Sequence, residues 1–189
     1  DLKAVKQELK DAKSLLQMDD LKNRKRVLRR LGYCTSADVI EFKGRVACEL
    51  SSGDELLITE MIFNGTFIDL SAPQCAALLS CFVCDDKATD LNMDKDLETP
   101  FKQMQDFARR IAKVSKECKM EVDEDSYVDK FKPTLMDIVS KWCKGASFLQ
   151  ICQMTEVFEG NIIRCMRRLE ELMRQMVQAS KTIGNTDLE

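Results

Sequence analysis

The chain has 189 residues, of which 44% are apolar, and its 29 basic and 32 acidic side chains leave a formal net charge of -3. This balance provides no bulk attraction to nucleic acid or to a membrane surface, so any RNA contact must come from a local basic patch. The chain contains no histidine, which excludes a Ser-His-Asp triad, a Cys-His dyad and every histidine-ligated metal site.

The first predicted element is a long helix with a heptad seam. Its apolar residues recur at intervals of three and four: Leu2, Val5, Leu9, Ala12 and Leu16. Charged residues occupy its other faces, so we expect a partner helix upstream of this chain to cover the seam. The pattern shifts near Asp19 and Asp20 and resumes as far as Gly32, a common C-terminal cap. Both ends resemble cuts through helical sequence, which predicts a fragment of a longer protein without a signal peptide.

The segment up to residue 84 contains two clear helix starts. Residues 33–50 are expected to hold one short strand or hairpin arm. Residues 52–55 (SGDE) have the pattern of a capping box and predict a short helix from Leu56 to Phe63. Residues 71–74 (SAPQ) combine a cap, a proline in the first turn and a glutamine three residues on. The apolar run from Cys75 to Cys84 that follows predicts a buried core helix.

Two further helices are predicted in the middle of the chain. The polar and acidic residues 85–98 indicate a loop, and Thr99-Pro100 marks the start of a helix whose apolar residues recur through Val114. A third long segment should run from Val128 to Cys143, with Pro133 in its first turn.

The last part of the chain predicts a short helix followed by a long one. Ser147 and Gln150 form a capping pattern, and the final helix should run from about Val157 to Ile183. We expect its apolar residues on one side: Ile162, Met166, Leu169, Met173 and Met176. Its arginines should lie on the opposite side: Arg164, Arg167, Arg168 and Arg174.

The nine cysteines are odd in number and irregular in spacing, and most lie in apolar runs, which favours a reducing compartment over a disulfide framework. Cys81 and Cys84 have the spacing of zinc ligands. A structural zinc needs four ligands, and the chain offers no second pair and no histidine. Core packing is therefore favoured over a metal or redox role. There is no phosphate-binding P-loop, and no apolar run reaches the roughly 18 residues of a membrane span.

Two basic clusters are candidates for binding nucleic acid. Arg164 and Arg168 are i,i+4 neighbours and should project about 6 Å apart in the same direction. That arrangement suits consecutive phosphates, or one phosphate and a base edge. The alternative is a solvated face with arginines paired to Glu170 or Glu171, and the residues alone favour it. Residues 23–30 form the second cluster, for which RNA or partner binding and a solvated face are both open, with the solvated face favoured.

Six strings, in order along the chain, resemble one family of proteins. They are RVLRRLGY at 26–33, KGRVACE at 43–49, GDELLITE at 53–60, QCAALLSCF at 74–82, FEGNIIR at 158–164 and RRLEEL at 167–172. Together they resemble the C-terminal region of superkiller-like DExH-box RNA helicases of the nuclear exosome-associated kind, including the DSHCT domain. The resemblance covers nearly the whole chain.

The resemblance implies an all-α fold in three parts. Residues 1–20 correspond to the stalk of the helicase arch, residues 21–70 to a winged-helix remnant and the start of the bundle, and residues 71–189 to the DSHCT helical bundle. It further implies an accessory region of an ATP-dependent 3'–5' RNA helicase that unwinds RNA and feeds it to the exosome. ATP and magnesium would bind the RecA-like core, so this segment holds no cofactor and no catalytic motif.

The resemblance also implies the partners and the contact residues. The partners are single-stranded RNA, the RecA-like core of the same protein, the nuclear exosome and polyadenylation-complex adaptors, without a membrane; the location is the nucleus, in nucleoplasm and nucleolus. RNA would contact Arg168, Arg164 and Asp86, where aspartate replaces the family's usual glutamate and shortens its reach. The alternative function is a protein-interaction scaffold that binds acidic partners without RNA. A DNA-binding helix-turn-helix is a weaker option, because the near-neutral charge counts against it.

Overall fold

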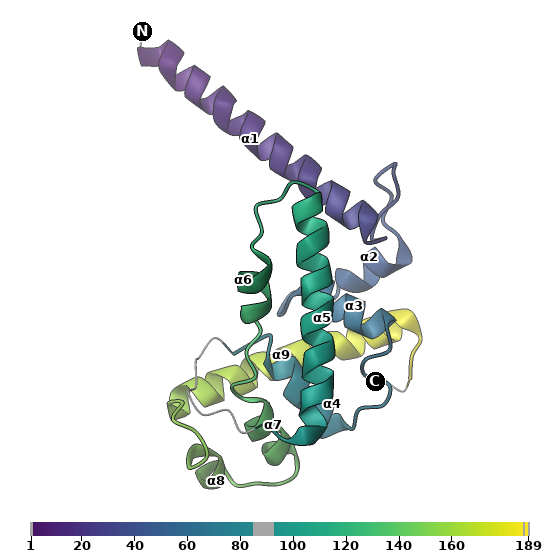
Figure 1. Cartoon of the computed structure of the whole chain (residues 1–189), viewed down its shortest axis with the longest axis vertical. Coiled ribbons are helices and arrows are strands. Elements are labelled where there is room, and N and C mark those ends of the chain that lie inside the picture. The colour runs from purple at the N-terminus through teal and green to yellow at the C-terminus, as the bar shows by residue number, and fades with distance from the viewer. Residues whose placement is uncertain (1, 85–92, 187, 189) are drawn as a thin grey trace.

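The computed structural model describes residues 2–84, 93–186 and 188, without the side chains of residues 13–16. Within these residues the chain is all-α and has no β-strand, which confirms the predicted fold class (Figure 1). The helices are α1 (Leu2–Arg30), α2 (Phe42–Ala47), α3 (Glu55–Phe63), α4 (Ala72–Ser80), α5 (Lys95–Glu117), α6 (Glu124–Asp129), α7 (Met136–Cys143), α8 (Phe148–Cys152) and α9 (Glu159–Ile183).

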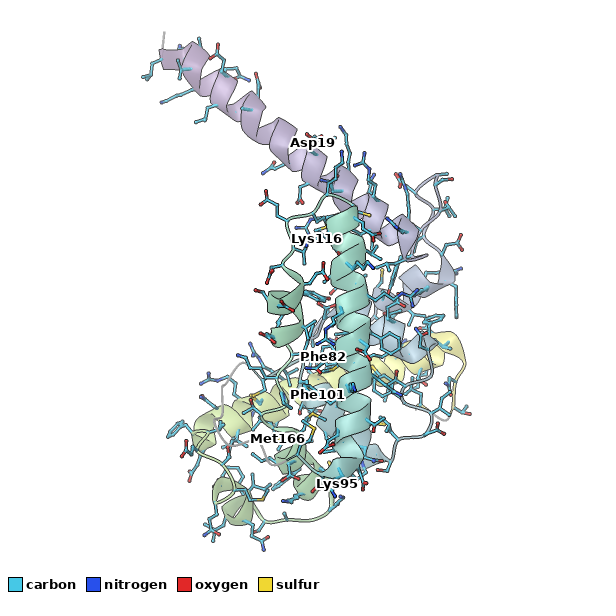
Figure 2. The ribbon with its side chains drawn as sticks, in the orientation of Figure 1. Asp19, Phe82, Lys95, Phe101, Lys116 and Met166 are labelled. Atoms are coloured by element: carbon cyan, nitrogen blue, oxygen red, sulfur yellow. The ribbon has the colours of Figure 1, made fainter. Side chains whose placement is uncertain are left out.

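The core surrounds α4, which packs against α5, α7 and α9. In Figure 2, Lys95 and Lys116 mark the two ends of α5, which runs the length of the body while α9 crosses it. Helix α4 is short and apolar, and its Leu78 is fully buried. Helix α9 contributes a continuous buried stripe: Ile162, Cys165, Leu169, Leu172, Met176 and Ala179. Each large apolar side chain buried here stabilises the fold by about 1.5–3 kcal/mol.

Helix α1 projects from this body, and only its last turns pack on it (Figure 1). The seam residues Leu2, Val5 and Leu9 are 73, 62 and 57% exposed. The helix runs without interruption past residue 20, the predicted end of the stalk. The division into stalk, winged-helix remnant and bundle stays a prediction.

The C-terminal part of α1 is bound to the end of α5 and to the residues just after it, and α1 ends before Gly32, as predicted. Asn23 Nδ2 donates a hydrogen bond to the Lys119 carbonyl over 3.1 Å, and Arg30 pairs with Glu117 at 2.5 Å. Gly32 then adopts a φ of +79°, a left-handed conformation that glycine reaches without strain.

The predicted strand or hairpin arm in residues 33–50 is wrong. Cys34 and Ile40 form a single antiparallel bridge, and the chain then enters α2. Helix α2 approaches the preceding loop so closely that a Cβ at Gly44 would lie 2.4 Å from the Tyr33 carbonyl oxygen. Only glycine permits this approach. The strand preference of residues 33–50, on which the prediction was based, gives no information about such a contact.

A polar network lies where α1, α2 and α3 meet. Lys43 Nζ lies 2.5 Å from Glu60 Oε1, which is almost fully buried, and donates to the Leu31 carbonyl over 3.0 Å. The Tyr33 hydroxyl donates to the Leu56 carbonyl over 3.0 Å, and Lys43 Nζ sits 4.8 Å from the centre of the Tyr33 ring. Burial and the nearby Glu60 carboxylate raise the pKa of Tyr33. The network joins the end of α1 to the bundle.

Three predicted helix boundaries shift in the structure. The cap of α3 is Asp54 rather than Ser52: its Oδ1 accepts the Leu57 N–H over 3.0 Å. The core helix spans only Ala72–Ser80, and residues 81–83, which were predicted to continue it, form turns. The predicted start at Thr99 is also wrong, because α5 begins earlier, at Lys95.

Pro100 therefore lies inside α5 instead of opening it. Because proline has no N–H, it leaves the Asp96 carbonyl without its usual helical donor. Gln74 Nε2, from the first turn of α4, donates to that carbonyl over 3.4 Å. This contact between two helices compensates a proline that local sequence rules place at a helix start.

The single helix predicted from Val128 to Cys143 is also wrong. The chain forms α6 and α7, which are separated by residues 130–135, and Pro133 lies between the helices. Proline disfavours helical geometry in the residue before it, which explains the break. Phe131 in this connection is buried and its ring centre lies 5.2 Å from that of Phe82.

The last two helices follow the prediction closely. Ser147 and Gln150 form the expected capping box of α8, and α9 ends at Gly184 with a φ of +76°. The apolar side of α9 is rotated from the predicted one. Met173 is 42% exposed and Met166 only half-buried, whereas Cys165 and Leu172 are buried.

Candidate nucleic-acid interface

A polar hollow of about 370 Å³ lies where three parts of the chain meet beside α9. The residues that line it are Ser52, Phe82, Val83, Arg168 and Glu171. Helix α9 contributes the arginine and the glutamate one turn apart. The loop before α3 supplies the serine, and the turns after α4 supply the other two. Figure 2 shows the phenylalanine within the body of the bundle.

Arg168 is held at the edge of this hollow. Its Nη1 donates to the Val83 carbonyl over 3.4 Å, and the Cys165 thiol donates to the same carbonyl over 3.7 Å. Carbonyls in the turns that end a helix carry partial negative charge, so a guanidinium is favourable there. The bond to the Val83 carbonyl therefore fixes the Arg168 side chain in the wall of the hollow.

Arg164 lies one turn before Arg168 on the same edge of α9 and is exposed. Within the described part of the chain, no carboxylate forms an ion pair with it. The structure thus brings together the two arginines that the sequence pattern singled out. Both lie on the solvent side of a helix whose other side is buried core.

The other two arginines of the predicted basic face lie elsewhere. Arg174 pairs with Glu170 at 2.6 Å, as the solvated-face alternative predicted, and this pairing raises its pKa. Arg167 lines a separate apolar hollow with Trp142 and Phe148. The four arginines therefore do not act as one surface.

Sequence reasoning missed Phe82, Ser52 and Glu171 as site residues. Phe82 is half-buried and packs one side of its ring on Phe131 while it also lines the hollow. Glu171 could have been found from spacing, because it follows Arg164 and Arg168 at i+7 and i+3 on one helix edge. Ser52 reaches the hollow through a loop, which no sequence periodicity reports. The predicted site residue Asp86 lies outside the described residues.

The second basic cluster, on α1, is paired with acids. Asp38 accepts from Arg29 at 2.6 Å and from Lys25 at 3.0 Å, and these two hydrogen bonds lower the pKa of Asp38. The remaining ion pairs of the cluster are Arg24–Asp20 and Arg30–Glu117, whereas Arg26 donates to Asn23 Oδ1 over 3.0 Å; Lys22, just before the cluster, pairs with Asp19. This pattern supports the solvated-face alternative for residues 23–30, with part of the cluster fastening the loop around Asp38.

The nine cysteines are all free thiols, and the reducing compartment stays a prediction. Cys81 and Cys84 are each 1% exposed, so both pack in the core, and burial raises the pKa of Cys81. Among the described residues, no group of three potential ligands is placed to hold a metal ion. In that same part of the chain, no helix combines the length and apolarity needed to cross a bilayer.

Comparison with known proteins gives concordant matches. The model of the DSHCT (NUC185) domain matches residues 37–189. The chain is 63% identical over 190 residues to the exosome RNA helicase MTR4 of Homo sapiens, and 60% identical over 191 residues to the ATP-dependent RNA helicase mtr4 of Schizosaccharomyces pombe. It is 46% identical to the DExH-box ATP-dependent RNA helicase DExH10 of Arabidopsis thaliana. Each match covers all of this chain but only 17–19% of the relative.

Proposed function

Because the chain belongs to the DSHCT family, we propose that it is the C-terminal accessory region of an ATP-dependent RNA helicase. In this proposal the helicase unwinds RNA in the 3'–5' direction and feeds it to the nuclear exosome. The names of the relatives, exosome RNA helicase among them, support the proposal. ATP hydrolysis belongs to RecA-like domains outside these 189 residues, so the purified chain should hydrolyse no ATP.

The RNA contact is supported by one observation: Arg168 lines a polar hollow, with Arg164 one turn away. Two guanidinium groups one helical turn apart match the spacing of neighbouring phosphates on a single strand. The half-buried Phe82 ring adds a surface against which a base can stack. Phosphate contact and stacking grip a strand without reading its sequence, which suits a helicase that processes many RNAs.

The decisive experiment is the double variant Arg164→Ala/Arg168→Ala in the full-length helicase. We expect the KM for single-stranded RNA in the ATPase assay to rise roughly tenfold to hundredfold, the effect of losing a hydrogen bond from a charged group. ATPase activity without RNA should not change. The matched control is Arg174→Ala, which removes an arginine of the same helix that is already paired with Glu170.

An unchanged KM for RNA in the double variant would reject the RNA contact. If a protein partner were lost at the same time, the scaffold that binds acidic partners would be the better explanation. The ion pairs of the α1 cluster count against the scaffold alternative, because Lys25, Arg29 and Arg30 already bind carboxylates of this chain and are less available to an acidic partner.

We also propose that the protein acts in the nucleus, in nucleoplasm and nucleolus, with the exosome and polyadenylation-complex adaptors. The RecA-like core of the same polypeptide would be the surface on which this bundle rests. Microscopy of the tagged full-length protein tests the nuclear location, and co-purification of exosome subunits tests the association with the exosome. A cytoplasmic distribution would contradict the first, and the absence of exosome subunits would contradict the second.

A further inference from the structure

We propose that Gln175 is a positioning residue for RNA binding, because it holds two walls of the polar hollow, Ser52 and Glu171, in place. The inference rests on the proposed function, since the hollow is the site at which RNA would bind. Gln175 itself does not line the hollow, so it would act through its neighbours.

The first wall is held through the backbone. Gln175 Oε1 accepts the N–H of Ser51 over 2.8 Å and the N–H of Ser52 over 2.9 Å. Its Nε2 donates to the Ser51 hydroxyl over 3.1 Å and to the Ser52 hydroxyl over 2.8 Å. These bonds join residues 124 and 123 positions apart in the sequence. One side chain of α9 thereby fixes the loop between α2 and α3.

The loop lies directly on the wall of the hollow. A Cβ at Gly53 would meet Phe82 and Leu172, each at 3.4 Å, and Ile58 at 2.7 Å. The backbone at this point is therefore pressed between α9 and the turns that follow α4. The Gln175 amide supplies an acceptor to two consecutive N–H groups of this loop, of which that of Ser52 is part-buried.

The second wall is held through the Glu171 carboxylate. Gln175 Nε2 donates to Glu171 Oε1 over 3.2 Å, across one turn of α9. Glu171 also lies three residues from Arg168, a spacing at which opposite charges pair on a helix surface. If the amide no longer holds the carboxylate, Glu171 gains freedom to swing towards Arg168 and to compete with an RNA phosphate for the guanidinium. Gln175 thereby biases Glu171 away from that pairing.

A glutamine suits this position because its amide is both an acceptor and a donor. The oxygen accepts from the two backbone N–H groups, and the two hydrogens of the nitrogen are shared among the two hydroxyls and the carboxylate. Alanine removes both functions. Glutamate keeps the acceptor oxygen for the loop but replaces the donor with a second oxygen that faces Glu171. The two substitutions therefore separate the backbone clamp from the orientation of the carboxylate.

The test uses the full-length helicase and a single-stranded RNA of mixed sequence. Gln175→Ala should raise the KM for RNA about threefold to tenfold, the effect of losing one or two neutral hydrogen bonds, while kcat changes less than about twofold. Gln178→Ala is the matched control: it removes an exposed glutamine of the same helix, outside the hollow. It should leave the KM unchanged.

Gln175→Glu supplies a readout that a purely structural role would not move. At neutral pH the new carboxylate lies beside Glu171, and the repulsion should raise the KM for RNA. Two carboxylates so close favour sharing one proton, which raises the pKa of the pair above the ordinary value of about 4.3. The KM ratio of variant to wild type should therefore fall as the pH is lowered from about 8 towards about 5.5, since the introduced carboxyl, once protonated, donates as the amide does.

The outcomes separate this inference from the proposed function. If Arg168→Ala leaves the KM for RNA unchanged, the proposed function fails whatever Gln175 does. If Arg168→Ala raises the KM but both Gln175 variants behave as the wild type, this inference fails alone. Should Gln175→Ala not fold, Gln175→Glu decides, because it retains the acceptor for the loop. A pH-independent KM ratio in that variant would overturn the role of the Glu171 contact.

Discussion

Helices α1 and α9 are both long and carry several arginines, but their surroundings differ. On α1 the basic residues from Lys22 to Arg30 largely face carboxylates of the same chain, including Asp38 and Glu117. On α9, Arg168 lines a polar hollow and donates to a backbone carbonyl, and Arg164 lies one helical turn before it. Each helix carries four arginines, but among the described residues three of those on α1 form ion pairs with carboxylates, whereas Arg164 of α9 forms none.

The partners of a cation therefore indicate its role better than its position in the sequence does. A guanidinium already bonded to a carboxylate gains little from a phosphate, because one ion pair is exchanged for another. An exposed pair such as Arg24–Asp20 also contributes little to stability. We therefore expect α1 to act as an anchored structural element and α9 as a binding element.

The largest effect is expected where α1 meets the bundle. Glu60→Ala would leave Lys43 without its carboxylate in a largely buried position, which should lower the free energy of unfolding by about 3–5 kcal/mol. Chemical denaturation measures this loss. The control is Glu55→Ala on the same helix, whose side chain is exposed and should cost less than about 1 kcal/mol. Equal effects of the two substitutions would mean that the buried network does not anchor α1.

A smaller effect is expected on the salt dependence of RNA binding, which should change for variants of α9 but not for variants of α1. If Arg164 and Arg168 each contact a phosphate, their double substitution by alanine should lower the slope of log affinity against log salt by about 1.4, at roughly 0.7 per phosphate. Lys22→Ala/Arg24→Ala on α1 removes the same number of charges and should leave the slope unchanged. Fluorescence anisotropy over a salt series measures both. Similar slope changes for the two double variants would show that α1 contacts RNA phosphates as α9 does.

The smallest effect concerns the loop that α1 fastens. The pKa of Asp38 is lowered in the folded state, so its pairing stabilises the protein above the unfolded pKa of about 3.9 and is lost as the pH falls through the folded value. Asp38→Asn should therefore lower Tm slightly at about pH 7, and the difference from wild type should shrink towards about pH 3. RNA affinity should stay the same. A difference in Tm that persists at the acidic end would show that Asp38 acts through something other than its charge.

Much of the fold follows from local patterns in the sequence. The helix periods, the capping box at Ser147 and the stop at Gly32 were visible because each depends on residues a few positions apart. The errors arose where distant contacts override local preference. Pro100 lies within α5, where Gln74 of another helix compensates the missing donor, and the predicted hairpin gave way to α2.

The site was predictable only in part, for the same physical reason. Arg164 and Arg168 could be selected because helical spacing places them on one edge. Helical spacing alone does not distinguish these two arginines from Arg174. Arg174 differs because it forms an ion pair with Glu170, and such a pair depends on the side-chain conformations in the folded protein. The wall formed by Ser52 depends on a contact with a residue 123 positions away, which no local rule can supply.

The close approach at Gly44 also limits which mutations this region can accept. Even alanine would bring a methyl carbon into steric conflict with the Tyr33 carbonyl oxygen and push α2 away from the loop, although no charge is removed. The neighbouring Lys43 would then lose its alignment with Glu60. Gly44→Ala should therefore weaken the same ion pair that Glu60→Ala removes. In a saturation library selected for soluble protein, position 44 should keep glycine while the exposed Arg45 beside it varies freely.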